Sequence, residues 1–143
     1  MDIEDGGDFR SRLKRGIRGD VRELILPGRL GQHLKDARLN GDVFINIIVA
    51  AEVAIEFKVE EKLRNALNAA FLTREEIPWE AASHAGAAHR AYRLRGGQRE
   101  RTLPDFLIGA HALVQHHRLL TRDARRYRAY FPDLEIIAPD THP

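Results

Sequence analysis

Three acidic residues stand at places where the sequence predicts the junction of a strand and a helix. Glu52 follows an apolar run, Asp105 lies in the first turn of a predicted helix, and Asp123 comes directly after a short apolar segment. Because ligands bind beyond the carboxyl ends of strands in an open parallel sheet, we expect these acids near one edge. Carboxylates brought together repel one another unless protons or a cation offset the charge, and Mg²⁺ binds such oxygens. The pattern is typical of a site where a metal ion orients and deprotonates water for attack on a phosphodiester.

Each acid also has a structural alternative. Asp105 after Pro104 is a favourable first-turn residue, because its charge complements the helix dipole. Asp123 is suited to capping the amino end of the next helix. Glu52 has apolar neighbours, and a buried unpaired carboxylate is costly, which favours a functional role for it. On spacing alone, both interpretations of the three acids stay open.

The elements that would position these acids alternate along the chain. Apolar periodicity and turn residues predict strands separated by helices, an arrangement that forms a parallel sheet covered on both faces. We therefore predict one α/β domain with three layers, α/β/α. The predicted strands are 21–26, 43–48, 118–121 and 134–138, and the predicted helices are 30–39, 49–57, 59–72, 78–95, 105–116 and 123–131.

The first 41 residues differ from the rest. They hold seven of the eleven glycines, and little periodicity precedes Leu24. We predict an atypical, partly irregular segment over residues 1–41 and the main domain over 42–143.

The composition excludes several classes of protein. Hydrophobic residues make up 43% and charged residues 31% of 143 residues, which is ordinary for a globular domain. Asn46 and Glu52 interrupt the longest apolar run, and we expect neither a membrane span nor a signal peptide. The absence of cysteine excludes disulfides and thiolate metal sites and suits a cytoplasmic protein. Histidine spacing, such as His84 with His89, does not favour a zinc site.

Arginine is concentrated in the second half of the chain. Between Arg90 and Arg128 lie ten arginines, no lysine and three acids, although the net charge is only +2. Arginine matches the geometry of phosphate oxygens, so a nucleic-acid surface is one interpretation, and solvated helix faces are the other. The candidate substrate-binding residues are Arg95, Arg99, Arg101 and Arg122.

Three blocks of sequence resemble a known family. The segment 45–53, with Glu52, looks like the part of VapC-type PIN domains that carries their second acid. The segment 103–112, Leu-Pro-Asp-Phe-Leu-Ile-Gly-Ala-His-Ala, resembles the motif of the third acid. The segments 119–123 and 127–139 resemble the family's last strand, helix and strand. The resemblance covers about residues 42–139.

The resemblance implies a function. VapC-type PIN domains are ribonuclease toxins of type II toxin–antitoxin systems, so it implies a metal-dependent endoribonuclease that uses Mg²⁺ or Mn²⁺. It also implies an RNA substrate, a cognate antitoxin and a homodimer. Glu52, Asp105 and Asp123 would be metal-site acids, and Thr121 would contribute a hydroxyl to the site.

The amino-terminal acidic motif of the family is absent from this chain. VapC proteins open with a hydrophobic strand that ends in an acid, whereas here the apolar stretch follows Asp20. A frameshift or a misplaced start would explain this, and Asp20 is the candidate replacement. Loss of one ligand predicts weaker Mg²⁺ binding and impaired cleavage. The alternative function is a degenerate PIN domain that still binds antitoxin or RNA.

Overall fold

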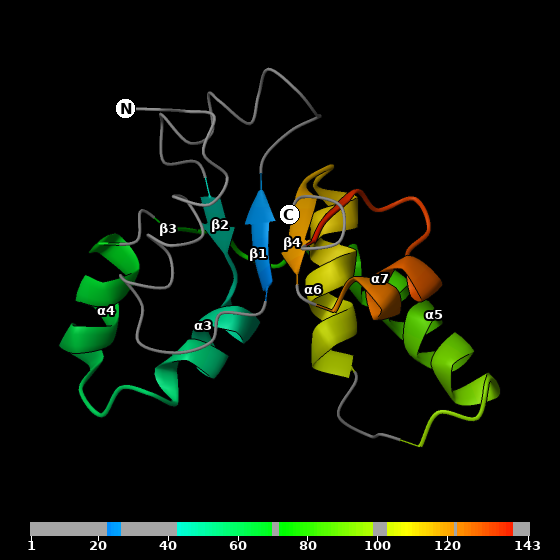
Figure 1. Ribbon diagram of the computed structural model, residues 1–143, viewed down its shortest axis with the longest axis horizontal. Helices are drawn as coiled ribbons and strands as arrows, with labels where there is room; N and C mark the ends of the chain where they lie inside the picture. The colour runs from blue at the N-terminus through cyan, green and yellow to red at the C-terminus, as the bar shows by residue number, and fades with distance from the viewer. Residues whose placement is uncertain (1–22, 27–42, 70–71, 99–102, 122, 139–143) are drawn as a thin grey trace.

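The computed structural model describes residues 23–26, 43–69, 72–98, 103–121 and 123–138. This part of the chain forms a sheet with helices beside it (Figure 1). In chain order its elements are β1 (Glu23–Leu26), β2 (Val43–Ile45), α3 (Ile47–Ala54), α4 (Glu60–Ala69), β3 (Leu72–Arg74), α5 (Ala81–Leu94), α6 (Leu103–Val114), β4 (Arg118–Thr121), α7 (Ala124–Tyr130) and β5 (Ile136–Ile137).

A capping residue sets the boundary between β2 and α3. Asn46 has extended backbone geometry, and its side-chain oxygen accepts a hydrogen bond from the backbone amide of Val49 at 3.0 Å. An asparagine cap satisfies an amide that the first helical turn leaves without a partner. The helix therefore begins at Ile47, and the prediction of a strand through residue 48 is wrong by three residues.

The segment after α4 was predicted incorrectly. We predicted a helix through residue 72, but α4 ends at Ala69 and Leu72–Arg74 pairs with β2 as the parallel strand β3. Leu72 is buried opposite Val43, so burial against a distant strand outweighs local helix preference there. The next helix, α5, begins at Ala81 rather than at Pro78.

The sheet has the order β3-β2-β1-β4-β5 and is only partly parallel. Parallel pairing is confirmed for β2 with β3 and for β4 with β5. The central strand β1 runs antiparallel to both of its neighbours, so the prediction of a parallel sheet is wrong for this strand. The four outer strands consequently end at one edge, and β1 begins at that same edge.

Helices α5, α6 and α7 lie together on the β4 side of the sheet, and α3 and α4 lie on the β2 side (Figure 1). The described residues include no helix that is long and apolar enough to cross a membrane. The predicted helix 30–39 lies outside the described residues.

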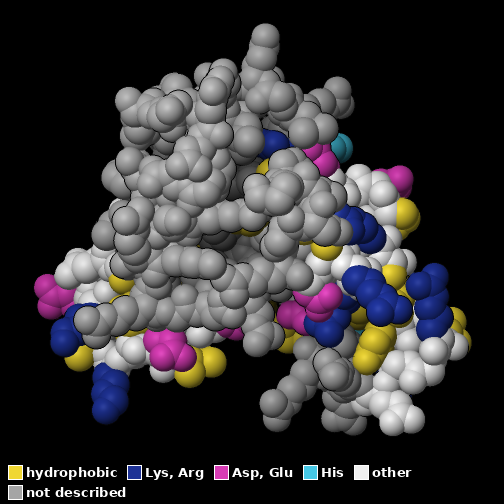
Figure 2. Space-filling model, viewed as in Figure 1, with side chains coloured by type: hydrophobic (Ala, Val, Ile, Leu, Met, Phe, Trp, Pro, Cys, Tyr) yellow, Lys and Arg dark blue, Asp and Glu magenta, His cyan; other side chains and the backbone are white. Residues whose placement is uncertain are grey.

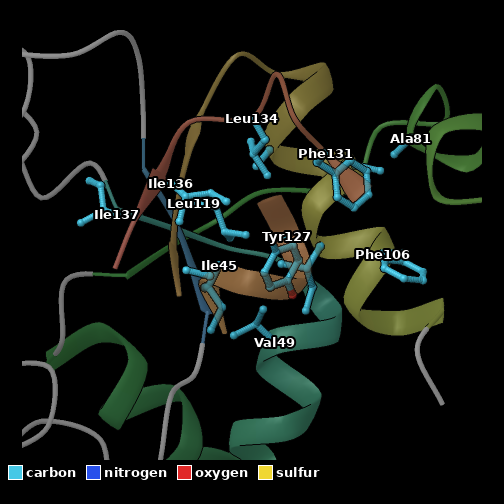
Figure 3. Packing of buried hydrophobic residues seen from close by; sticks show 14 of the residues in the cluster. Ile45, Val49, Ala81, Phe106, Leu119, Tyr127, Phe131, Leu134, Ile136 and Ile137 are labelled. Carbon is cyan, nitrogen blue, oxygen red and sulfur yellow. The ribbon is translucent and has the colours of Figure 1, made fainter. Parts of the chain in front are cut away.

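The core joins the sheet to the helices. Leu119 and Ile136 project from neighbouring strands toward Tyr127, while Ile45 at the end of β2 and Val49 in the first turn of α3 lie nearby (Figure 3). Phe106 of α6 is fully buried, and its ring is 6.1 Å from that of Phe131 between centroids. These contacts fix the first turn of α6 and the whole of α7, the two elements that carry Asp105 and Asp123.

Candidate active site

Two of the three predicted acids meet at one place. Asp105 lies in the first turn of α6, and Asp123 precedes the first residue of α7, just beyond the carboxyl end of β4. The guanidinium group of Arg126 contacts both: Nη1 bonds Oδ2 of Asp105, and Nε lies 3.4 Å from Oδ2 of Asp123. Two acids that are 18 residues apart in sequence thus contact the same guanidinium group.

The site is partly open to solvent. The side chains of Asp105 and Arg126 are 21% and 24% exposed, whereas that of Asp123 is 45% exposed. Partial exposure leaves the carboxylates accessible to a ligand while it limits the screening of their charges by water.

Local hydrogen bonds fix Asp123. Its Oδ1 accepts from the backbone amide of Arg126 at 3.4 Å, so the predicted capping role is confirmed. The buried hydroxyl of Thr121 accepts from the backbone amide of Asp123 at 3.0 Å. Thr121 therefore holds the backbone that carries the acid, which is a positioning contact.

Glu52 lies on α3, and its side chain is exposed. The argument that this carboxylate is buried among apolar neighbours is therefore wrong: Val49 and Val53 face the core and Glu52 does not. Helix α3 packs against α6, the helix that carries Asp105. The assignment of Glu52 to the site stays a prediction.

The donor types at the pair fit a hard divalent cation, because Mg²⁺ binds carboxylate oxygens. Arg126, however, already pairs with both acids, and its single positive charge offsets one of their two negative charges. Within the described ranges, no group of three or more His, Asp or Glu side chains is arranged to hold a metal ion. The pair would thus be only part of a metal centre.

The register of β1 brings one further acid to this edge. Glu23, the first residue of β1, is the Cα partner of Thr121 at the end of β4. A parallel central strand would have brought its carboxyl end to this edge, whereas the antiparallel strand brings its first residue. Sequence analysis missed Glu23, because strand direction is not encoded locally.

Basic side chains gather over α5, α6 and α7 (Figure 2). Among the predicted substrate-binding arginines, Arg95 is exposed, donates to the carbonyl of Ala129 at 3.5 Å and lies 5.0 Å from the ring centroid of Tyr130. Three others, Arg99, Arg101 and Arg122, lie outside the described residues, as does Asp20.

A second polar cluster, which sequence analysis missed, lies beside the sheet and is partly buried. Glu75 follows β3, and its Oε1 bonds Nε2 of His111 at 2.7 Å and Nε2 of His117 at 2.9 Å. Asn46 reaches Nδ1 of His111 at 3.1 Å, and the ring of His117 stacks on Phe44. His111 lies in the segment 103–112 that resembles the motif of the third acid, but its partner Glu75 lies 36 residues away.

Hydrogen bonding determines the protonation of His111. Since the oxygen of Asn46 accepts from Val49, its NH₂ group faces the ring and Nδ1 of His111 must accept. The proton is then on Nε2, which donates to Glu75. Burial lowers the pKa of His111, and the hydrogen bond and charge of Glu75 oppose this shift. The four side chains of Asn46, Glu75, His111 and His117 bond one another, so we interpret this cluster as a structural network.

Comparison with known proteins identifies the family. Neither a curated protein nor a solved structure matches the sequence. The family model described as "PIN domain" matches residues 24–132, more than half of the 143 residues, and includes both Asp105 and Asp123. The matched range begins at residue 24, within the segment 1–41 that we predicted to be atypical. The chain therefore belongs to the PIN domain family, whose members are generally nucleases.

Proposed function

We propose that this protein is a divalent-cation-dependent endoribonuclease and the toxin of a toxin–antitoxin pair. The observation that carries the proposal is the meeting of Asp105 and Asp123 at one guanidinium group. Two carboxylates held at a partly open sheet edge, in a nuclease-type domain, are suited to binding a cation beside a phosphate.

The proposed roles follow from the contacts. Asp105 and Asp123 would hold Mg²⁺ or Mn²⁺, and Glu52 on the neighbouring α3 would be a further acid of the site. When bound, the cation would activate water and offset the negative charge of the phosphate. Thr121 acts through Asp123, because its hydroxyl accepts from the backbone amide of that acid.

RNA is the proposed substrate, and the arginine-rich second half of the chain supports this choice. Arg95, held against the ring of Tyr130 and the carbonyl of Ala129, presents a positive charge beside α7. Arg99, Arg101 and Arg122 would add to this surface. A cytoplasmic location, a homodimer and a cognate antitoxin belong to the same proposal and follow from the sequence resemblance to VapC-type toxins.

Cleavage of a labelled, structured RNA by the purified chain tests the proposal. We expect slow cleavage with Mn²⁺ or Mg²⁺, because the amino-terminal acid motif is missing, none with a chelator, and a further loss of at least about 10²-fold in Asp105→Asn and Asp123→Asn. Asp133→Asn is the matched control, because Asp133 is exposed in the turn after α7 and the substitution removes the same charge. Equal cleavage by wild type and Asp105→Asn would contradict the proposal.

Two further results separate the toxin from its alternative. Induced expression in bacteria should arrest growth, and Asp105→Asn should relieve the arrest. The alternative is a PIN domain that binds antitoxin or RNA without cleaving, and the missing amino-terminal acid motif supports it. It predicts RNA binding without cation-dependent cleavage.

A further inference from the structure

Arg126 occupies the position between the two acids. Its Nη1 bonds Oδ2 of Asp105, and its Nε lies 3.4 Å from Oδ2 of Asp123. The other oxygen of Asp123, Oδ1, accepts from the backbone amide of the same arginine at 3.4 Å. One residue therefore engages both carboxylates, and at Asp123 it engages both oxygens.

Without the two acids, the location of Arg126 in α7 would be unfavourable. Arg126 lies in the first turn of the helix, where a positive charge opposes the helix dipole. Its side chain is three-quarters buried, at 24% exposure, whereas the neighbouring Arg125 is exposed. The two carboxylates compensate both costs, which explains why the guanidinium group lies between them.

We propose that Arg126 is an internal cation that a divalent metal ion must displace in order to bind Asp105 and Asp123. The proposal rests on the proposed function, which makes these acids the cation ligands. Metal ion and guanidinium group would compete for the same carboxylate oxygens, and their like charges repel at contact distance. Binding of the metal would release the guanidinium group, which then becomes available to the phosphate oxygens of RNA.

We call the displacement of Arg126 by the metal ion the exchange. It is tested by Mn²⁺ binding to the full-length chain, measured by electron paramagnetic resonance of the free ion. We expect Arg126→Gln to bind Mn²⁺ about tenfold more tightly than wild type, because a unit charge in contact with the ligands is removed. Arg125→Gln removes the same charge from the neighbouring residue, which is exposed. For this variant we expect the Mn²⁺ affinity to change by less than about threefold. Equal affinities in Arg126→Gln and Arg125→Gln would overturn the proposal.

A measurement on the wild-type chain does not depend on how well a variant folds. The side-chain Nε–H resonance of Arg126 should shift as Mg²⁺ saturates the protein, while that of Arg95 should not. If Asp105→Asn abolishes Mn²⁺ binding but the Arg126 resonance is unmoved by Mg²⁺, the exchange is wrong and the proposed function stands. If neither wild type nor Arg126→Gln binds Mn²⁺, both the exchange and the metal dependence are wrong.

Discussion

The partly buried network around Glu75 yields a prediction for stability. Glu75→Gln keeps the shape of the side chain but removes its charge and replaces one acceptor oxygen with a donor. In the native protein the carboxylate accepts from Nε2 of both His111 and His117. In the variant the amide oxygen can take the place of Oε1 and accept from both rings, but both hydrogen bonds would lose their charge assistance, and the NH₂ group would replace the Oε2 that lies 3.2 Å from Nε2 of His117.

The size of the effect follows from the contacts. A hydrogen bond to a charged group contributes roughly 1.5–3 kcal/mol net and a neutral one roughly 0.5–1.5 kcal/mol, so each of the two bonds would lose about 1 kcal/mol. Because Glu75 is 21% exposed, water compensates part of the loss. We therefore expect the free energy of unfolding to fall by about 2 kcal/mol.

Urea denaturation followed by circular dichroism measures this change. Glu76→Gln is the matched control, because Glu76 is the next residue, is exposed and undergoes the same substitution. A surface change of this kind should stay within about 0.5 kcal/mol. Equal stability of Glu75→Gln and Glu76→Gln would refute the reasoning.

The same network predicts a pH dependence. Burial lowers the pKa of His111 in the folded state, so the unfolded chain takes up this proton first as the pH falls below about 6.5. Stability from His111 is thus complete above that pH and is lost below it, by at most about 1.4 kcal/mol per pH unit. His111→Gln should lose this part of the slope. An identical pH dependence in wild type and His111→Gln would contradict the assignment.

Three further predictions concern the core, the site edge and the RNA surface. Gly109→Ala should destabilise the fold by about 1–3 kcal/mol in thermal unfolding, because a Cβ there would lie 2.7 Å from the ring of Phe131; an unchanged midpoint would contradict the packing. Glu23→Gln should weaken Mn²⁺ binding more than Asp20→Asn if the register of β1 supplies the missing acid, and the reverse order would favour Asp20. RNA binding should weaken steeply with salt, and removal of the charge of Arg95 should reduce the slope by about 0.7–0.9; a slope equal to that of wild type would exclude a phosphate contact.

Local signals predicted the second half of the fold well. The strand 118–121 was predicted with its observed bounds, and the helices that start near Leu103 and Asp123 were predicted within two residues. These elements have strong local markers, namely Pro104 in the first turn of the first helix and Asp123 as a cap for the second. The family resemblance rested on the same residues.

Features set by distant pairing could not be predicted. The strand β3 spans three residues and depends on its partner β2, and the direction of β1 depends on both of its neighbours. The partners of His111 lie far from it in sequence, so its spacing carried no signal. Similarly, Asp105 and Arg126 are 21 residues apart, and only the packing of α6 near α7 brings them together.

The most direct test of the central claim is the location of a bound cation. Mn²⁺ broadens the resonances of nearby nuclei, so a titration of the ¹⁵N-labelled chain maps the site without relying on cleavage. The account predicts that the amide signals of Asp105 and of residues 123–126 broaden first, and that Asp105→Asn abolishes the effect. Broadening that starts at Glu75 or His117, or that persists unchanged in Asp105→Asn, would contradict it.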